Sequence, residues 1–163
     1  MEFFAWFEST PLSIWVRESP LVFPTILIVH ALGMGSLVGV NIFIGMRLLG
    51  FVRSISAEML RRFLPILWLG FFASLASGLL LLAAYPAKAL TNPIFYLKFT
   101  FIGAAFAVLR TIRNRAAMMD ELDAMPAPIR ISAVVMMVLW VAAIIAGRFL
   151  AYTHSVLLAS HLY

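Results

Sequence analysis

The sequence predicts an all-α, polytopic membrane protein: an antiparallel bundle of four transmembrane helices with an N-terminal interfacial helix. Two observations carry this prediction. Of the 163 residues, 64% are hydrophobic and only 12% are charged, whereas a soluble domain is about 25% charged. The apolar residues also gather into four runs, each close to the roughly 20 residues that a helix needs to cross the hydrocarbon core of a bilayer.

The first segment, residues 1–19, is expected to be an amphipathic segment lying in the membrane interface. Trp6 and Trp15 suit this position, because tryptophan is enriched at the boundary between membrane and water. Thr10 and Pro11 form a helix start, since threonine caps helices and proline is favoured in the first turn. Glu8 interrupts the apolar run, so this segment is not expected to span.

The bundle itself is predicted to occupy residues 20–155, followed by a short external tail at 156–163. Each span begins or ends beside proline, which punctuates helices. The predicted spans run from Pro20 to about Met46, from Phe63 to about Tyr85, from Pro93 to about Leu109 and from Ile129 to about Tyr152.

The basic residues predict the orientation of the bundle. Eight of the 12 Lys and Arg residues lie between the first and second spans or between the third and fourth: Arg47, Arg53, Arg61, Arg62, Arg110, Arg113, Arg115 and Arg130. By the positive-inside rule these two connections are cytoplasmic, which places the N- and C-termini outside. The net charge of +5 therefore reflects topology, and no nucleic-acid partner is expected.

Small residues recur every four positions in three of the spans. Such rows let helix backbones approach closely in lipid, either within one bundle or between copies of the chain. The rows are Ala31, Gly35 and Gly39; Gly70, Ser74 and Gly78; and Ala143 with Gly147.

Ionisable side chains inside the spans are the main candidates for function, because charge is costly in hydrocarbon. His30, Lys98 and Arg148 are predicted to share one layer, roughly 18–26 Å above the cytoplasmic boundary at 1.5 Å per helical residue. Ser77 falls at a similar height. Tyr152 follows Arg148 by four residues and shares its helix face.

This polar layer contains no acid, since every Asp and Glu lies in the N-terminal segment or in the cytoplasmic connections. Two cations without a buried partner need an anion, water or lipid phosphate. One interpretation is that Lys98 and Arg148 extend to lipid headgroups. The other is a site for an anionic ligand, such as haem propionates, a polar quinone head or a lipid headgroup.

His30 could supply a ligand or hydrogen bond to such a site, or could simply bond a neighbouring helix. It shares one helix stripe with Met34, Leu37 and Asn41, so this face could line a cavity. A b-type haem is a natural occupant of a helix bundle, and it would be held by His30 alone, by His30 with a methionine, or by His30 with the same residue of a second copy. Copper held by His30 and Met34 is a further option, because thioethers suit Cu(I).

Three stretches of the chain resemble a known family. They read LVFPTILIVHALGMGSLVGVNIFIGMRLLG, NPIFYLKF and AGRFLAY. They are similar to a family of small, uncharacterised four-helix bacterial inner-membrane proteins, distantly like the membrane domain of copper-resistance D-type proteins and b-type cytochrome bundles. The resemblance covers about Trp15 to Tyr152. Family members usually carry Asp before the Arg-Leu-Leu-Gly run, where this chain has Met46, so a partner for Arg47 is missing.

The resemblance implies a four-helix fold and a bacterial inner-membrane location, without an established activity. The residues themselves lack the motifs of an enzyme, and the zero cysteines exclude thiolate metal sites within the chain. We therefore expect a non-catalytic membrane subunit that binds haem b or quinone and takes part in electron transfer within a larger complex. The alternative is a structural or assembly subunit that binds lipid or partner helices, and copper handling is a third option.

Overall fold

A computed structural model of the chain describes residues 6–52, 59, 62–116 and 126–160, with side chains described as far as Thr153. These residues form helices and contain no strand. Arg53, Arg61 and residues 161–163 of the predicted tail lie outside the described residues. The helices are α2 (Pro11–Glu18), α3 (Val22–Leu49), α5 (Leu64–Ala84), α6 (Pro86–Leu90), α7 (Pro93–Ala116) and α8 (Ala127–Ser160).

Four of these helices, α3, α5, α7 and α8, are long and apolar enough to cross a membrane. This confirms the four helical runs read from the sequence. Helix α3 ends at Gly50, whose φ of 90° places it in the left-handed region that favours glycine. The connection between α5 and α7 contains the short helix α6, which Pro86 opens.

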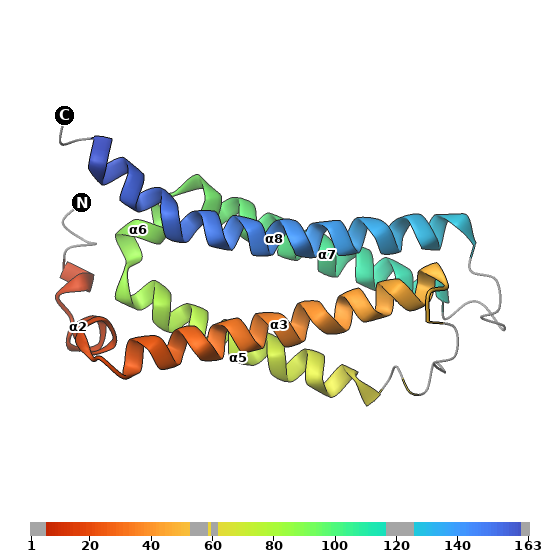
Figure 1. The fold of residues 1–163 in the computed structure, drawn as a ribbon, viewed down its shortest axis with the longest axis horizontal. Coiled ribbons are helices and arrows are strands. Elements are labelled where there is room, and N and C mark those ends of the chain that lie inside the picture. Colours follow the sequence, from red (N-terminus) through yellow and green to blue (C-terminus); the bar gives the residue numbers. More distant parts are fainter. Residues whose placement is uncertain (1–5, 53–58, 60–61, 117–125, 161–163) are drawn as a thin grey trace.

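The long helices lie side by side, with α3 and α7 running in one direction and α5 and α8 in the other (Figure 1). The closest pairs are α3 with α5 and α7 with α8, and α3 also contacts α8. One end carries α2 and α6, and we call it the α2 end. The opposite end, the arginine end, carries the terminal arginines of the long helices: Arg47, Arg62, Arg113, Arg115 and Arg130.

The main apolar core joins all four long helices. Its fully buried members include Leu67 of α5, with Met136 and Trp140 of α8. Phe106 of α7 links two of these helices, because its ring lies edge-on to Trp140 at 5.4 Å and to Phe71 of α5 at 5.6 Å. Packing of this kind, rather than exclusion of water, is what holds helices together in lipid.

A close backbone contact joins α3 and α5 at two glycines. A Cβ atom on Gly33 would lie 2.7 Å from the backbone nitrogen of Ser74, and one on Gly70 would lie 2.8 Å from the carbonyl oxygen of Gly33. Gly35 and Gly39 instead face outward, with nothing within 4 Å of such an atom. The α3 row of small residues that contains Gly35 and Gly39 therefore does not pack against α5; Gly33 does.

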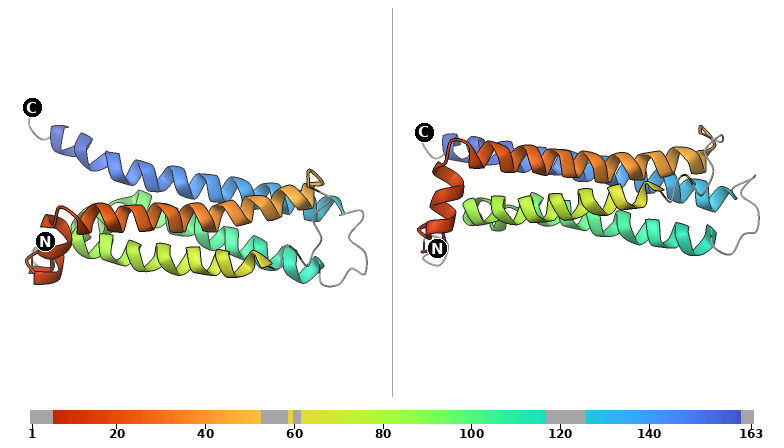
Figure 2. Two further views of the ribbon diagram at one scale, coloured as in Figure 1. Left: turned by 60° about the horizontal axis from the view of Figure 1, so that its bottom comes forward. Right: turned by 90° about the horizontal axis from the view of Figure 1, so that it is seen from below.

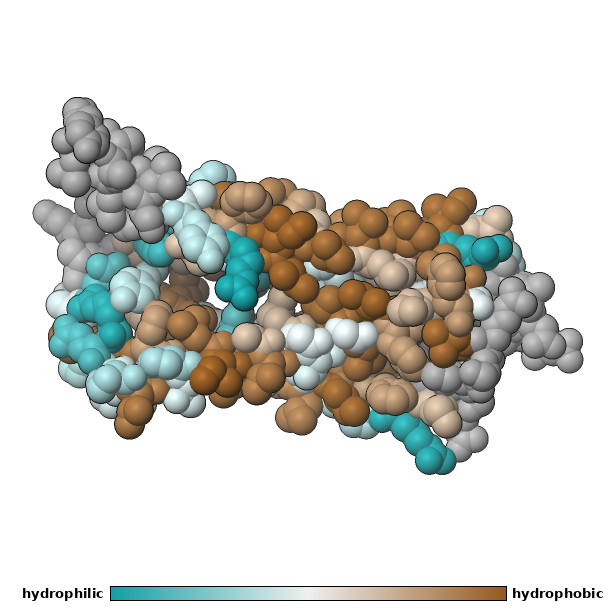
Figure 3. Space-filling model, in the orientation of Figure 1, coloured by the Kyte–Doolittle hydropathy of each residue, from teal (hydrophilic) through white to brown (hydrophobic). Residues whose placement is uncertain are grey.

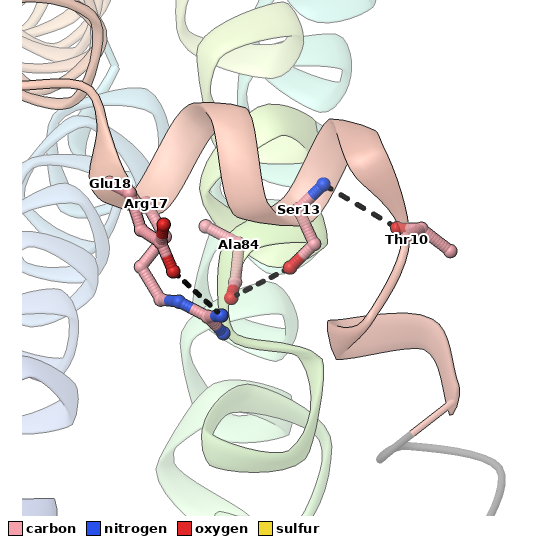
Figure 4. Close-up of polar contacts among 5 residues, drawn as sticks. All are labelled: Thr10, Ser13, Arg17, Glu18 and Ala84. Carbon is pink, nitrogen blue, oxygen red and sulfur yellow. Dashed lines mark hydrogen bonds and ion pairs between the residues drawn. The ribbon is translucent and has the colours of Figure 1, made fainter.

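The N-terminal helix α2 lies across the end of the bundle, as Figure 2 shows. Its cap is the predicted one, because the Thr10 side chain accepts a hydrogen bond from the backbone N–H of Ser13. The Ser13 hydroxyl in turn donates to the carbonyl oxygen of Ala84 at 3.3 Å (Figure 4). Since Ala84 ends α5, this bond satisfies a carbonyl that the helix itself leaves open. Val16 also packs against α3 and α5.

Candidate functional site

His30 is held against α5 by one ring nitrogen. Its Nδ1 lies 3.0 Å from the carbonyl oxygen of Ser74 and 3.1 Å from the hydroxyl oxygen of Ser77. A carbonyl oxygen can only accept, so Nδ1 carries the proton and donates it. The Ser77 hydroxyl uses its own proton on Ala73, whose oxygen is 2.6 Å away. In this tautomer Nε2 keeps its lone pair.

The Nε2 atom makes no hydrogen bond within the part of the chain that the structure describes, since both polar contacts of the ring involve Nδ1. This matches the usual arrangement of a ligating histidine, which donates its other ring N–H to a carbonyl and is thereby oriented. The ring lies close to Gly78, where a Cβ atom would be 3.2 Å from His30 Cε1. Glycine at position 78 thus makes room for the imidazole.

Lys98 reaches the same region from α7. Its ammonium nitrogen would lie 3.6 Å from a Cβ atom on Gly147, so the lysine side chain lies against α8 at this glycine. It is also near enough to His30 for the two groups to interact electrostatically. The sequence prediction that His30, Ser77 and Lys98 share a layer agrees with these contacts.

Arg148 follows Gly147 on α8 and is exposed. Among the described residues it has no hydrogen bond or ion pair, and the acidic side chains of that set, Glu8 and Glu18, belong to the N-terminal segment. Lys98 on α7 lies near Gly147, the residue before Arg148 on α8. The described parts of the spans hold no carboxylate to balance these two positive charges.

An opening in the surface separates the α3/α5 pair from the α7/α8 pair toward the α2 end, and hydrophilic surface borders it (Figure 3). The arginine end lacks such space, because α3 and α8 touch there: a Cβ atom on Gly45 would lie 2.6 Å from Met137 Sδ. The polar layer thus occurs where the two helix pairs diverge, and a ligand could enter between them.

Three other residues expected at the site make no side-chain hydrogen bond with His30 or Lys98 in the described part of the chain. Asn41 is fully buried in α3, eleven residues from His30, and donates to the carbonyl oxygen of Leu37 at 2.8 Å. Met34 packs against the main core. Tyr152 is 64% exposed on α8. The described residues hold no cluster of three or more His, Asp or Glu able to bind one metal ion.

Sequence reasoning missed the groups that orient His30. The partner of Nδ1 is a backbone carbonyl, which no side-chain pattern can reveal, although the serines at positions 74 and 77 mark that turn of α5. The sequence places Gly78 in the row of small residues Gly70, Ser74 and Gly78, which predicts helix packing. In the structure the nearest atoms to a Cβ on Gly78 belong to the His30 imidazole of α3.

Comparison of the chain with protein-family models, with curated proteins and with solved structures found no match. The resemblance drawn from the sequence stays a prediction. The candidate site consequently rests on its own geometry.

Proposed function

We propose that the four long helices cross a bacterial inner membrane as an antiparallel bundle, with the arginine end in the cytoplasm and both termini outside. The arginines at one end support this orientation through the positive-inside rule, and the sequence resemblance supports the location. Reporter fusions at residue 163 should score as external and those near residue 117 as cytoplasmic. The reverse pattern would refute the orientation.

Within this bundle, His30, Lys98 and Arg148 bind an anionic redox cofactor in the outer half of the membrane. The observation that carries this proposal is the fixed imidazole: Nδ1–H is engaged by the Ser74 carbonyl, and Nε2 is directed away from it with a lone pair. Two cations without an acid from the spans lie on the neighbouring helices, and they favour a ligand that brings negative charge.

The residues fit haem b better than copper. His30 would provide an axial nitrogen, and Lys98 and Arg148 would pair with the propionates, while the haem would supply one-electron transfer. The half-buried Met34, whose thioether copper would need, packs against the main core. A quinone fits less fully, because it would use His30 and Lys98 only as hydrogen-bonding groups.

The chain would serve as a non-catalytic subunit of a larger electron-transfer complex, or pair with its own copy, from which a second axial ligand could come.

Absorption spectroscopy of the purified protein tests this proposal. We expect a Soret band in the wild type that is lost in His30→Ala and kept in His154→Ala, which removes another histidine of the chain. A colourless protein whose extract contains quinone would favour the quinone form. A protein with neither chromophore nor quinone would contradict cofactor binding.

The two cations provide a second test. If Lys98 and Arg148 hold one shared ligand, either Lys98→Met or Arg148→Met should already release it, and the double variant should add little. Arg17→Met serves as the control, because this arginine lies in α2 and pairs with Glu18 at 3.7 Å. Additive losses, measured as retained ligand by native mass spectrometry, would contradict a shared pocket.

A structural or assembly subunit that binds lipid is the competing proposal, and the exposure of Arg148 and Tyr152 favours it. Long basic side chains and tyrosine commonly reach the headgroup region in this way. This function predicts that the protein carries phospholipid but no chromophore, and that His30→Ala changes neither.

A further inference from the structure

A cavity of about 420 Å³ lies at the α2 end, separate from the layer around His30. Its lining residues come from four parts of the chain: Glu8 before α2, Phe23 in the first turn of α3, Tyr85 at the end of α5, and Ala87 with Lys88 in α6. This volume is within the range of small-molecule sites. Nothing in the proposed cofactor site uses these residues.

The cavity presents one negative and one positive group that do not neutralise each other. Among the described residues the ion pair found within 4.0 Å is Arg17 with Glu18, and Glu8 has no hydrogen bond or ion pair there. The ammonium of Lys88 donates to the carbonyl oxygen of Ala151 at 3.2 Å, which uses one of its three protons. Both charges therefore retain capacity for a ligand between them.

Two aromatic rings complete the wall. Phe23 and Tyr85 meet edge to face, with centroids 6.0 Å apart and an interplanar angle of 82°. Aromatic faces attract ammonium groups through their quadrupoles. The acid and the rings together suit a cation, while Lys88 suits an anion such as phosphate.

We propose that this cavity binds the headgroup of a zwitterionic phospholipid with a primary amine, phosphatidylethanolamine. Glu8 and the two rings receive the ammonium, and Lys88 receives the phosphate. The proposal rests on the membrane insertion proposed above, which sets the α2 end at the level of the headgroups. Figure 3 agrees with this level, since hydrophilic surface gathers around the α2 end and apolar surface covers the long helices.

The charge pair distinguishes this lipid from others. An anionic phosphatidylglycerol headgroup would meet Lys88 favourably but would bring no cation to Glu8, leaving the carboxylate to repel it. Phosphatidylcholine would keep the cation, yet its quaternary nitrogen has no N–H to donate to the carboxylate. A headgroup with both an ammonium N–H and a phosphate uses all the groups that line the cavity.

Native mass spectrometry of the full chain in mild detergent, with equimolar phosphatidylethanolamine and phosphatidylglycerol of identical acyl chains, tests the proposal. We expect bound phosphatidylethanolamine to exceed phosphatidylglycerol by roughly three- to fivefold, the size that partly exposed ion pairs produce. Glu8→Gln should bring the ratio close to one, and Glu8→Lys should invert it. Lys88→Met should lower the retention of both lipids.

Glu18→Gln is the matched control, because it removes a nearby carboxylate that does not line the cavity. It should leave the ratio unchanged, as should Lys98→Met in the cofactor site. Equal binding of the two lipids by the wild type, or equal effects of Glu8→Gln and Glu18→Gln, would overturn the proposal. Failure of cofactor binding appears in the absorption spectrum and failure of insertion in the reporter fusions, so both are distinguishable from this outcome.

Discussion

At the arginine end, buried side chains of α3, α5, α7 and α8 form one continuous apolar cluster, whereas the buried cluster at the α2 end joins only α2, α3 and α5. At the α2 end, polar contacts join α8 to α6 and to the start of α7. Asn92 donates to the Thr153 hydroxyl at 2.9 Å, and Lys88 donates to Ala151. All four long helices are packed together at the arginine end, whereas at the α2 end α7 and α8 are held by a few hydrogen bonds.

This difference indicates how the bundle combines stability with a site. A close-packed end can fix the mutual position of the helices, because interiors tolerate little change in volume. The diverging end then has room for His30 and Lys98 without requiring their burial in the core. The polar layer therefore depends on the arginine end for its geometry.

The largest expected effect comes from removing the main core side chain. Trp140 is fully buried on α8, so Trp140→Ala should destabilise the protein by about 3–5 kcal/mol through the cavity that it leaves. Tyr152→Ala, at the exposed end of the same helix, should cost less than about 0.5 kcal/mol. Thermal unfolding in detergent measures both. Similar losses for the two variants would contradict the division between the ends.

The contact of α3 with α5 gives the second prediction. Gly33→Ala places a methyl group 2.7 Å from backbone atoms of Ser74 that cannot move aside, and we expect a loss of about 1–3 kcal/mol. Gly35→Ala is the matched control, since its added carbon meets nothing within 4 Å. It should be neutral or stabilising by up to about 1 kcal/mol, because alanine favours the helix. The same thermal assay reads out both; a destabilising Gly35→Ala would instead point to an interface between copies.

These two glycines also show what the sequence could and could not predict. Hydropathy and proline positions predicted the four long helices, because both properties are local in the chain. The glycine spacing predicted that α5 would pack through Gly70, but in α3 it pointed to Gly35 rather than Gly33. A row of small residues marks a face that permits close approach, and only the rotation of each helix decides which face meets a neighbour.

The candidate site divides in the same way. Helix rise placed His30, Ser77 and Lys98 at one height, and the contacts of His30 agree. The stripe argument grouped Asn41 with His30 on one face of α3. In the structure Asn41 is buried, and its Oδ1 lacks a partner among the described residues. Residue spacing predicts which side chains share one face of a helix. It does not predict at which height along the bundle the α3/α5 pair separates from the α7/α8 pair.

A third prediction concerns the imidazole. If the Ser74 carbonyl fixes the tautomer, ¹⁵N NMR of His30 should show a protonated Nδ1 and an unprotonated Nε2 in the neutral ring. Gly78→Ala should disturb this signal by displacing the ring, since its carbon would be 3.2 Å from Cε1, and should change stability by about 1 kcal/mol or less. Gly103→Ala, with nothing within 4 Å, is the control. A ring protonated on Nε2 instead would remove the main support for a ligating histidine.

The most local effect is expected where α2 meets α5. Ser13→Ala removes the hydroxyl that donates to Ala84, leaving a buried carbonyl at the end of α5 without this partner, and should cost about 1 kcal/mol. The loss should be local, because α2 contributes only Val16 to the smaller cluster and nothing to the main one. Hydrogen exchange should therefore accelerate in residues 11–18 while α8 remains protected. Ser36→Ala, whose hydroxyl bonds only within its own helix at 2.9 Å, should leave exchange in α2 unchanged. If exchange rose equally in α8, the two ends of the bundle would be coupled more tightly than their separate clusters indicate.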